Sequence, residues 1–349
     1  MHTTHRVIYH SAEELSELAD QSVDLVVTSP PYPMIGMWDD LFVQWDTDIE
    51  RALANEDGPK AFDIMHRRLD LVWKEVARVA RDGAFVCVNI GDATRTIGSE
   101  FRLYPNHARI LQGLQSVGLN LLPDILWHKQ SNAPNKFMGS GMLPAGAYVT
   151  LEHEYILIAR KGKKRVFSTS GQRMNRRSSA LFWEERNVWF SDIWSDLKGT
   201  GQRIESHGSR TRSGAFPFEL AYRLINMYSV KDDLVLDPFL GTGTSIQAAI
   251  SSARNSIGFE VDGNLDSLIV ENMETGIRTG QERIDRRLSD HRAFISGREP
   301  TQHISTPYLF PVMTAHETDL YLEVPNSLTW LESNRCTVQY EAVGESVTE

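Results

Sequence analysis

The sequence predicts an α/β fold in which helices cover both faces of a mostly parallel sheet. Apolar runs of strand length recur along the chain, and stretches with apolar residues at helical spacing separate them, as where the stretch 62–80 precedes the run 84–89. This alternation is typical of parallel strands joined by crossover helices. A length of 349 residues suits one large domain with insertions, or two small domains.

Each expected element follows from the local spacing of apolar, capping and turn residues. Strands are expected at 7–9, 23–27, 84–89, 124–127, 152–158, 234–236 and 255–259. Helices are expected from Ser11, over 62–80, 106–117 and 216–228, from Thr244, and from about Leu265. Residues 161–204 carry no sustained period and are interpreted as an insertion. From Glu299 onward we expect loop, with a short strand at 320–324.

Composition narrows the class of protein. The two cysteines, Cys87 and Cys336, are too few for a disulfide framework or a cysteine-rich metal site. No apolar run reaches membrane-spanning length, and the first residues lack the apolar core of a secretory signal. His153 and Glu154 have no third metal ligand at a recognisable spacing. We therefore expect a soluble, reduced, cytoplasmic protein that binds no metal.

The charge is distributed unevenly along the chain. The net charge is −10, yet residues 160–213 contain thirteen Lys or Arg against five Asp or Glu. Residues 313–349 contain one Arg against seven acidic residues. A basic segment in an acidic protein is typical of a surface that binds phosphates. Solvated surface charge explains the same pattern, so charge alone leaves nucleic-acid binding open.

The segment from Asp237 to Thr244 has the pattern of a ligand-binding loop between a strand and a helix. Gly241 and Gly243 allow positive φ and close approach of a ligand to the backbone. Ligands of open α/β sheets bind at the carboxyl ends of strands, where this loop falls. It lacks the Lys of a phosphate-binding loop and the third Gly of a dinucleotide fingerprint. Glu260, at the end of the next strand, suits ribose hydroxyls, although a solvated strand end would carry the same residue.

Ser29-Pro30-Pro31-Tyr32 follows the apolar strand 23–27 directly. The prolines stiffen the loop and supply no N–H donors, which leaves carbonyl oxygens free at the strand end. The Ser29 hydroxyl and the Pro30 carbonyl are two acceptors that suit the two hydrogens of an exocyclic amino group. Tyr32 offers an aromatic face. A proline-rich ligand in a surface loop is the alternative, but a buried strand directly before the motif argues against it.

These residues resemble the amino-methylating DNA methyltransferases. In that family a (D/N/S)PP(Y/F/W) tetrapeptide is catalytic, and a D-P-F-x-G-x-G-T loop binds S-adenosyl-L-methionine. The order here, with the tetrapeptide first, is similar to the β group, which is a circular permutation of the Rossmann-like methyltransferase fold. The resemblance covers residues 5–275. It includes the residues 125–129 and Pro134, which resemble the wall of the target-base pocket.

The resemblance implies a set of site residues. The catalytic residues are Ser29, Pro30, Pro31 and Tyr32. The residues that bind S-adenosyl-L-methionine are Asp237, Phe239, Gly241, Gly243, Thr244, Glu260, Phe216 and Pro217. One departure stands at the end of the first strand, where His10-Ser11 replaces the Gly-Asp of many members and puts a cofactor contact from that loop in doubt.

The resemblance also implies three regions and a DNA partner. They are a catalytic domain at 1–275, a basic insertion for target recognition at 161–212, and a C-terminal extension at 276–349 without an assigned role. The target base must leave the duplex to reach the pocket, where Tyr32 stacks on it and Trp127 and Phe137 can add apolar wall. Trp183, Trp189 and Trp194 are expected in local cores. The candidates for phosphate or guanine contacts are Arg173, Arg176, Arg177, Arg210 and Arg212.

A serine in the first position of the tetrapeptide resembles the cytosine-N4 enzymes, whereas aspartate is usual in adenine-N6 enzymes. The expected activity is site-specific methylation of cytosine N4 in duplex DNA, as the protecting half of a restriction–modification pair with a cognate endonuclease. Adenine-N6 methylation is the first alternative, and methylation of protein glutamine or RNA the second. Cytosine-C5 chemistry needs a Pro-Cys pair, which the chain lacks. A dinucleotide-dependent oxidoreductase would need the full glycine fingerprint, which the chain lacks, and a non-catalytic DNA-binding module leaves Ser-Pro-Pro-Tyr unexplained.

Overall fold

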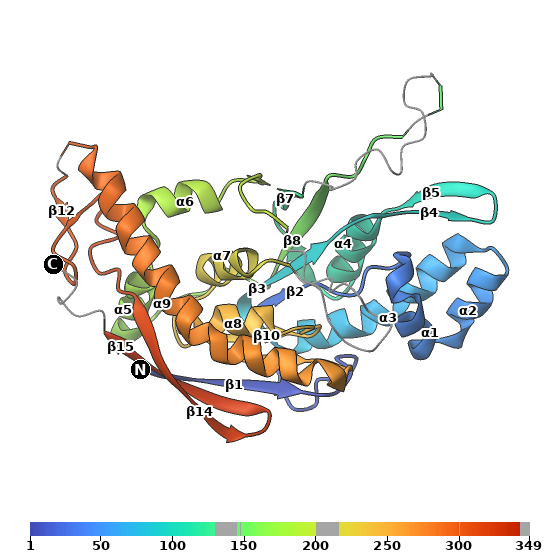
Figure 1. Cartoon of the computed structure of the whole chain (residues 1–349), viewed down its shortest axis with the longest axis horizontal. Helices are drawn as coiled ribbons and strands as arrows, with labels where there is room; N and C mark the ends of the chain where they lie inside the picture. The colour runs from blue at the N-terminus through green and yellow to red at the C-terminus, as the bar shows by residue number, and fades with distance from the viewer. Residues whose placement is uncertain (130–144, 147, 200–215, 300, 343–349) are drawn as a thin grey trace.

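A long mixed sheet forms the middle layer of the molecule, and helices lie on both of its faces (Figure 1). The computed structural model describes residues 1–129, 145–146, 148–199, 216–299 and 301–342. Within these residues the main sheet has eleven strands in the order β14-β15-β1-β11-β10-β2-β3-β8-β7-β9, and β6 pairs with β8. The α/β class, with helices on both faces of the sheet, is as predicted.

The centre of the sheet is parallel and its two ends are partly antiparallel. The parallel neighbours are β1 (His2–Ile8), β11 (Asn255–Phe259), β10 (Leu234–Asp237), β2 (Val23–Thr28) and β3 (Ala80–Ile90). One end is built by β8 (His153–Lys161), β7 (Ile125–His128), β6 (Leu119–Leu121) and β9 (Ile193–Trp194). The other end is the hairpin of β14 (Glu323–Glu332) and β15 (Arg335–Ala342). All carboxyl ends of the central strands therefore lie along one edge.

Two layers of helices cover this sheet. One face carries α3 (Gly58–Val79) and α4 (Asn106–Ser116), and the other carries α7 (Phe218–Tyr228) and α8 (Thr244–Ile250), on which α9 (Asp266–Ser296) packs. The smaller helices are η1 (Gly36–Trp38), α1 (Asp39–Trp45), α2 (Thr47–Ala54), α5 (Ser170–Ser178), α6 (Trp183–Trp189) and η3 (Gly263–Leu265). Two small hairpins are β4 (Ala93–Ile97) with β5 (Glu100–Tyr104), and β12 (His303–Ile304) with β13 (Pro311–Val312).

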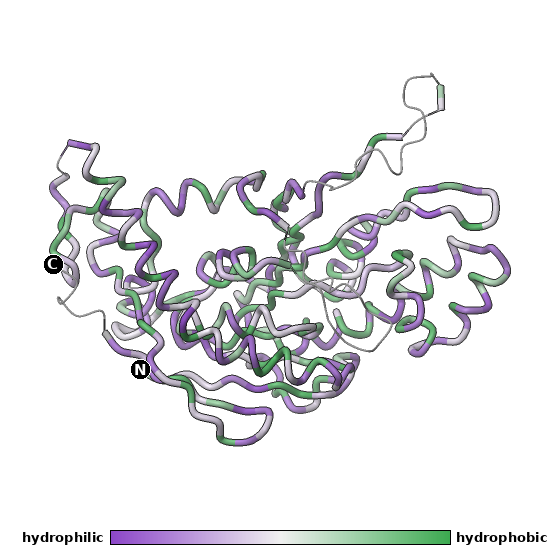
Figure 2. The backbone as a smooth tube through the Cα atoms, in the orientation of Figure 1, coloured by the Kyte–Doolittle hydropathy of each residue, from purple (hydrophilic) through white to green (hydrophobic). Residues whose placement is uncertain are grey.

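Burial on both faces explains why β2, in which every residue is buried, is apolar except for Asp24 and Thr28. Val26 packs in the core that contains α3, whereas Leu25 and Val27 pack in the core that contains α7. Strands of parallel sheets read as unbroken apolar runs for this reason. Figure 2 shows hydrophilic and hydrophobic residues alternating along α9, which has only one face against the rest of the molecule. No helix of the described residues is long and apolar enough to cross a membrane.

The helix expected from Ser11 is wrong, because residues 11–22 form turns and bends. Leu15 and Leu18 are buried as the spacing suggested, but side chains of α3 make hydrogen bonds to the backbone of this segment. Arg78 donates to the carbonyls of Leu15 and Leu18 at 2.9 and 3.1 Å, and Glu75 accepts from the Leu15 N–H at 3.0 Å. Tertiary hydrogen bonds therefore replace the helical ones.

The C-terminal segment is also more regular than predicted. The expected short strand at 320–324 only touches the start of β14, and two strands of ten and eight residues follow. β15 pairs antiparallel with β1, with His5 opposite Cys336, and the Tyr340 hydroxyl donates to the Ile250 carbonyl at 2.8 Å. The segment extends the main sheet, and local sequence gives no sign of its partner strand.

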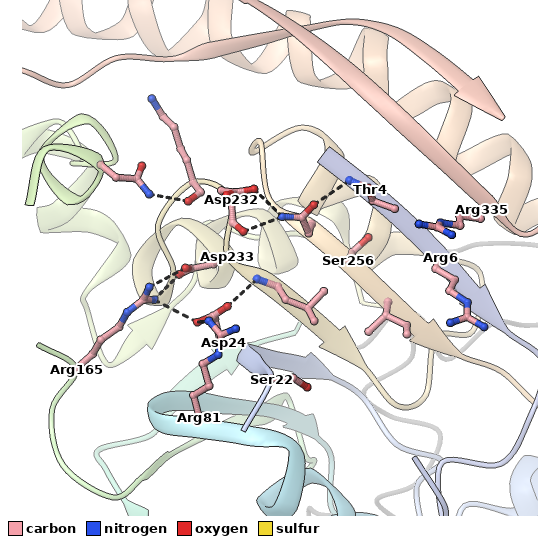
Figure 3. A pocket seen from close by; sticks show the side chains of 15 residues that line it. Thr4, Arg6, Ser22, Asp24, Arg81, Arg165, Asp232, Asp233, Ser256 and Arg335 are labelled. Carbon is pink, nitrogen blue, oxygen red and sulfur yellow. Dashed lines mark hydrogen bonds and ion pairs between the residues drawn. The ribbon is translucent and has the colours of Figure 1, made fainter. Parts of the chain in front are cut away.

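The amino edge of the central strands contains a cavity bordered by ion pairs between buried carboxylates and partly exposed arginines (Figure 3). Arg165 bonds both carboxylate oxygens of Asp233 at 2.7 and 2.9 Å and lies 3.6 Å from Asp24. Asp24 also pairs with Arg81 at 2.8 Å and accepts from the Leu234 N–H at 3.0 Å. Burial and the neighbouring charge of Asp233 raise the pKa of Asp24. Arg165 therefore neutralises two carboxylates that join β2 to the start of β10.

Replacing Arg165 with Met should destabilise the fold by about 2–3 kcal/mol at pH 8, because two buried carboxylates lose their shared cation. This destabilisation is smaller than that expected from breaking a fully buried ion pair, since 32% of the Arg165 side chain is exposed. The pKa of Asp24, already raised by burial, should rise further in the variant. The loss should therefore shrink at pH 5, where protonation relieves the repulsion.

Urea unfolding of both proteins at pH 8 and pH 5 measures this effect. Arg51→Met is the matched control, since the Arg51–Asp48 pair is exposed and should contribute under about 1 kcal/mol. An Arg165→Met loss of equal size at both pH values would argue against the electrostatic role.

Candidate active site

The two motif loops leave neighbouring strands at the same edge of the sheet. β2 and β10 pair in parallel, with Val26 opposite Leu236. The loop Ser29–Tyr32 begins after Thr28, and the glycine loop begins after Asp237. The structure therefore brings together the two segments that the sequence places about two hundred residues apart.

Asp237 joins these loops beneath the surface. Its Oδ1 accepts from the Thr28 hydroxyl at 2.6 Å and from the Phe239 N–H at 3.0 Å, and its Oδ2 accepts from the Ser245 hydroxyl at 2.6 Å. The residue is only 2% exposed. Protein groups bond both carboxylate oxygens of Asp237, so the residue links the two loops from below. Its expected part in cofactor binding stays a prediction.

Burial raises the pKa of Asp237 to about 6, although the bonds from Ser245, Thr28 and Phe239 act in the opposite direction. Desolvation therefore outweighs three hydrogen bonds here. An ionised carboxylate at this position costs folding free energy. The fold nevertheless keeps a carboxyl group at this position, where it connects the two loops.

The glycine loop takes the conformation that its sequence predicts. Gly241 and Gly243 have φ of 56° and 88°, in the left-handed region that favours glycine. Glu260 accepts from the Gly241 N–H through Oε2 and from the Asp262 N–H through Oε1, both at 2.8 Å. Glu260 thus fixes the loop to the end of β11. A Cβ at Gly258 would lie 2.6 Å from the Leu240 side chain, so this position also needs glycine.

The other predicted cofactor residues surround this loop. Phe239 packs edge-on against Trp73 with ring centroids 6.1 Å apart, and Phe216 is buried in the core beneath α7. Pro217 is the N-cap of α7, and Thr244 is the buried first residue of α8. A Cβ built at Gly241 meets no atom within 4 Å, so the described part of the loop faces open space. This open glycine surface fits a nucleoside cofactor that approaches the backbone closely.

The Ser29–Tyr32 loop is held rigidly against α4. Pro30 and Pro31 are buried, and Ser29 and Tyr32 are half-buried. Asn106 donates to the Pro33 carbonyl at 3.1 Å and to the Gly91 carbonyl at 3.0 Å, and the Ile35 N–H donates to the Tyr32 carbonyl at 3.2 Å. Among the described residues no hydrogen bond ends on the Pro30 carbonyl. This oxygen is therefore available to a ligand.

Three residues gather beside Tyr32. Lys129 belongs to the stretch 125–129 expected in the wall of the target-base pocket, whereas Asn89 and Glu154 escaped the sequence-based prediction of the site. The Tyr32 hydroxyl bonds Glu154 Oε2 at 3.0 Å and Asn89 Nδ2 at 2.9 Å, and Lys129 pairs with Glu154 Oε1 at 2.6 Å. Asn89 and Glu154 are buried polar residues next to the apolar runs 84–88 of β3 and 155–159 of β8. A polar residue beside such a run is the signal that could have found them.

The aromatic residues divide between core and surface. Trp127 is fully buried and its Nε1 donates to the Leu197 carbonyl at 3.0 Å, so it belongs to the core rather than to a pocket wall. Trp189 and Trp194 are buried, as expected, and Trp183 is 37% exposed. Pro134 and Phe137 lie outside the described residues.

The candidate DNA contacts on α5 lie at the opposite edge of the sheet. Asn175 of α5 donates to the Lys231 carbonyl at 2.8 Å, just before the start of β10, and Figure 1 shows α5 beside β15. Arg177 pairs with Asp319 at 2.7 Å, Arg176 stacks on Phe167 at 4.9 Å, and Arg173 donates to the Ser168 carbonyl. This placement does not support base reading next to Ser29. Arg210 and Arg212 lie outside the described residues.

Metal ligands do not gather in the residues that the structure describes, where no group of three His, Cys, Asp or Glu could hold an ion. Glu154, which the sequence offered as one half of a metal pair, instead binds Tyr32, Asn89 and Lys129. The expectation of a metal-free enzyme stays a prediction.

A glycine loop and a Ser-Pro-Pro-Tyr loop at adjacent strand ends of an open α/β sheet define a Rossmann-like, S-adenosylmethionine-dependent methyltransferase. Residues 23–271 match the DNA methylase family whose members act on N6 or N4 amino groups, and the chain belongs to that family. The protein is thus a DNA methyltransferase, and its methyl donor is S-adenosyl-L-methionine.

Relatives of this chain extend over most of its length. The type II methyltransferase M.MthZI of Methanothermobacter thermautotrophicus is 49% identical over 344 residues, covering 98% of this chain and 97% of that protein. The type II methyltransferase M.MjaI of Methanocaldococcus jannaschii is 48% identical over 282 residues, covering 77% and 91%. A Thermus thermophilus protein assigned as a DNA modification methylase, solved with S-adenosyl-L-methionine, is 30% identical with a TM-score of 0.61, covering 78% and 94%.

Replacing Asp237 with Asn should remove a pH dependence of stability. The wild-type carboxyl has its pKa raised from 3.8 to about 6 in the folded state. Its ionisation therefore disfavours folding as pH rises through this window. The wild type should lose up to about 3 kcal/mol relative to Asp237→Asn between pH 4 and pH 7.

Urea titrations at intervals across that window measure the difference. Asp48→Asn, at an exposed site, is the control and should follow the wild type at a constant offset. Parallel curves for Asp237→Asn would show that Asp237 does not titrate in this range.

Proposed function

We propose that this enzyme methylates the N4 amino group of a cytosine flipped out of duplex DNA at a specific sequence. Ser29 in the first position of the tetrapeptide is the observation that carries the choice of base. Its hydroxyl is a compact acceptor on a loop fixed by Asn106, beside the Pro30 carbonyl, on which no hydrogen bond from the described residues ends. These two oxygens suit the two hydrogens of one amino group.

The residues of the two loops divide the chemistry. The glycine loop at Gly241 and Gly243, with Glu260 and Phe239 beside it, would hold S-adenosyl-L-methionine, which would supply an electrophilic methyl group on a sulfonium. Ser29 and Pro30 accept the amino hydrogens and turn the nitrogen lone pair out of the ring plane. The bond from Thr28 to Asp237 fixes one loop relative to the other. Positioning and electrostatics supply the rate enhancement, and no covalent intermediate is needed.

Tyr32 receives the base after it leaves the stack. Flipping costs a few kcal/mol, and stacking on an aromatic ring returns about 1–3 kcal/mol. The Tyr32 ring is half-buried, and bonds from Asn89 and to Glu154 fix its hydroxyl. A ring fixed in this way loses little entropy when a base stacks on it.

Target recognition, in this proposal, belongs to the later part of the insertion 161–212. β9 runs parallel to β7, so residues 195–199 lead to the carboxyl edge, where a Cβ at Gly199 would lie 3.3 Å from Lys129 Cε. In this proposal residues 1–275 form the catalytic unit, and the strands β14 and β15 of the region 276–349 extend its sheet. Because the relatives are type II methyltransferases, we assign the enzyme to a restriction–modification pair with an endonuclease of the same specificity, acting in the cytoplasm.

The product nucleoside decides between cytosine and adenine. Duplex DNA incubated with enzyme and cofactor should yield N4-methyldeoxycytidine on digestion and mass spectrometry. Detection of N6-methyldeoxyadenosine instead would overturn the assignment to cytosine. The fold and the chemistry proposed for the two loops would be unaffected.

Ser29→Ala and Tyr32→Ala should separate catalysis from cofactor binding. Removing one acceptor of the amino group should slow single-turnover methylation by about ten- to a hundredfold, and removing the ring should weaken capture of the flipped base by a similar factor. Calorimetric affinity for S-adenosyl-L-methionine should stay within about twofold of the wild type. Full activity of Tyr32→Ala would exclude the stacking role, and lost cofactor affinity in both variants would exclude the assignment of this loop to the base.

A further inference from the structure

The Tyr32 hydroxyl has every one of its hydrogen-bonding positions filled by protein. Glu154 Oε2 lies at 3.0 Å, Asn89 Nδ2 at 2.9 Å and Ser29 Oγ at 3.3 Å. A phenol has one hydrogen to donate and accepts through its oxygen. With three partners, the directions of the bonds follow from which partners can donate.

Glu154 can only accept, because its carboxylate forms an ion pair with Lys129 at 2.6 Å. Asn89 Nδ2 can only donate, and it donates both to the phenol and to Glu154 Oε2 at 2.8 Å. Turning the Asn89 amide over would put its oxygen against a carboxylate oxygen. The amide instead leaves Oδ1 without a partner among the described residues, although Asn89 is only 2% exposed.

The phenol hydrogen therefore points to Glu154. Burial and the negative charge of Glu154 raise the pKa of Tyr32 well above its ordinary value, so the phenol stays protonated. Its oxygen must then accept from Ser29, and the Ser29 hydroxyl hydrogen points to Tyr32. At 3.3 Å this bond is longer than the usual 2.7–2.8 Å, so it orients the hydroxyl more than it stabilises the fold.

We propose that Glu154, paired with Lys129, is a positioning residue that sets the direction of a hydrogen-bond relay from Ser29 to Tyr32 to Glu154. The relay holds the Ser29 hydrogen away from the substrate and presents the Ser29 oxygen lone pairs to the target amino group. This inference rests on the acceptor role proposed for Ser29. It assigns a function to a buried glutamate that lies in another strand and touches no substrate.

Glu154→Gln is the test, and it is made in an Asn89→Ala background. Asn89 Nδ2 lies 2.8 Å from Glu154 Oε2, so opposite a glutamine the Asn89 amide would turn over and accept the phenol hydrogen itself. The comparisons below are all made in that background, which serves as their wild type.

Lys129 then fixes how the new amide turns. Lys129 donates to the Oε1 position, so the amide oxygen stays there and the amide nitrogen faces Tyr32. That nitrogen donates, and the phenol hydrogen must turn toward Ser29 Oγ. The relay is then reversed, and a lone pair needed by the substrate is occupied.

Single-turnover transfer from tritiated S-adenosyl-L-methionine to duplex DNA should slow by about ten- to a hundredfold in Glu154→Gln, the scale of one hydrogen bond to a group that gains charge. Cofactor affinity and the thermal midpoint should stay near wild-type values. Glu152→Gln, two residues earlier in the same segment, is the matched control and should transfer methyl at the wild-type rate.

A double-mutant cycle separates the relay from a purely structural role. Ser29→Ala removes the hydroxyl that the relay orients. Adding Glu154→Gln to that variant should therefore slow transfer by less than about twofold. If Glu154 merely supports the Tyr32 ring, adding Glu154→Gln should slow transfer by the same factor in Ser29→Ala as in the wild type. Tyr32→Phe keeps the ring and removes the hydroxyl. Transfer by Tyr32→Phe should be slowed about as much as transfer by Glu154→Gln. Adding Glu154→Gln to Tyr32→Phe should slow transfer no further.

Two outcomes overturn the relay: wild-type transfer by Glu154→Gln, or full additivity with Ser29→Ala. The methylated nucleoside is identified in the same samples. An adenine product would therefore contradict the proposed function, whereas the ratios between variants contradict or support the relay independently, since both bases present an amino group.

Discussion

The geometry of the site depends on the buried carboxylate of Asp237. It accepts from Thr28 on the strand before the Ser29 loop and from Ser245 and Phe239 around the glycine loop. Parallel pairing places these strand ends side by side, but it leaves the loops free to diverge. A methyl transfer needs its donor and acceptor aligned to within a fraction of an ångström. The short bonds to Asp237 supply that alignment, at the cost of burying a carboxyl whose pKa rises to about 6.

The two edges of the sheet use buried charge differently. At the amino edge, Arg165 and Arg81 neutralise Asp24 and Asp233, so acid and base cancel within the fold. At the carboxyl edge, Glu154 is paired with Lys129 but still directs an oxygen to Tyr32. The Glu154 carboxylate accepts hydrogen bonds from the Lys129 cation and from the neutral donors Asn89 and Tyr32, so it can fix the orientation of the Tyr32 hydroxyl. The ion pairs at the amino edge are thus structural, whereas the proposed chemistry uses the carboxyl edge.

Prediction from sequence succeeded where the determinants are local. The buried strand before Ser29, the helix that became α3 and the glycine positions of positive φ all follow from periodicity or backbone sterics. It failed where a distant partner decides. Leu15 and Leu18 sit in turns because Arg78 satisfies their carbonyls, and β15 forms because β1 offers an open edge. The basic character of α5 was visible, but its position at the amino edge was not.

The sequence by itself determined the class of chemistry, because Ser-Pro-Pro-Tyr and Asp-Pro-Phe-Leu-Gly-Thr-Gly-Thr each carry their loop conformation and reactive groups within a few residues. Only the tertiary structure decided the role of Asp237 and brought Asn89, Lys129 and Glu154 to Tyr32. These contacts join residues far apart in the chain, and a side chain at the end of a strand can face a ligand, solvent or another loop. Which of these it meets depends on strand order and register, which a single sequence does not specify.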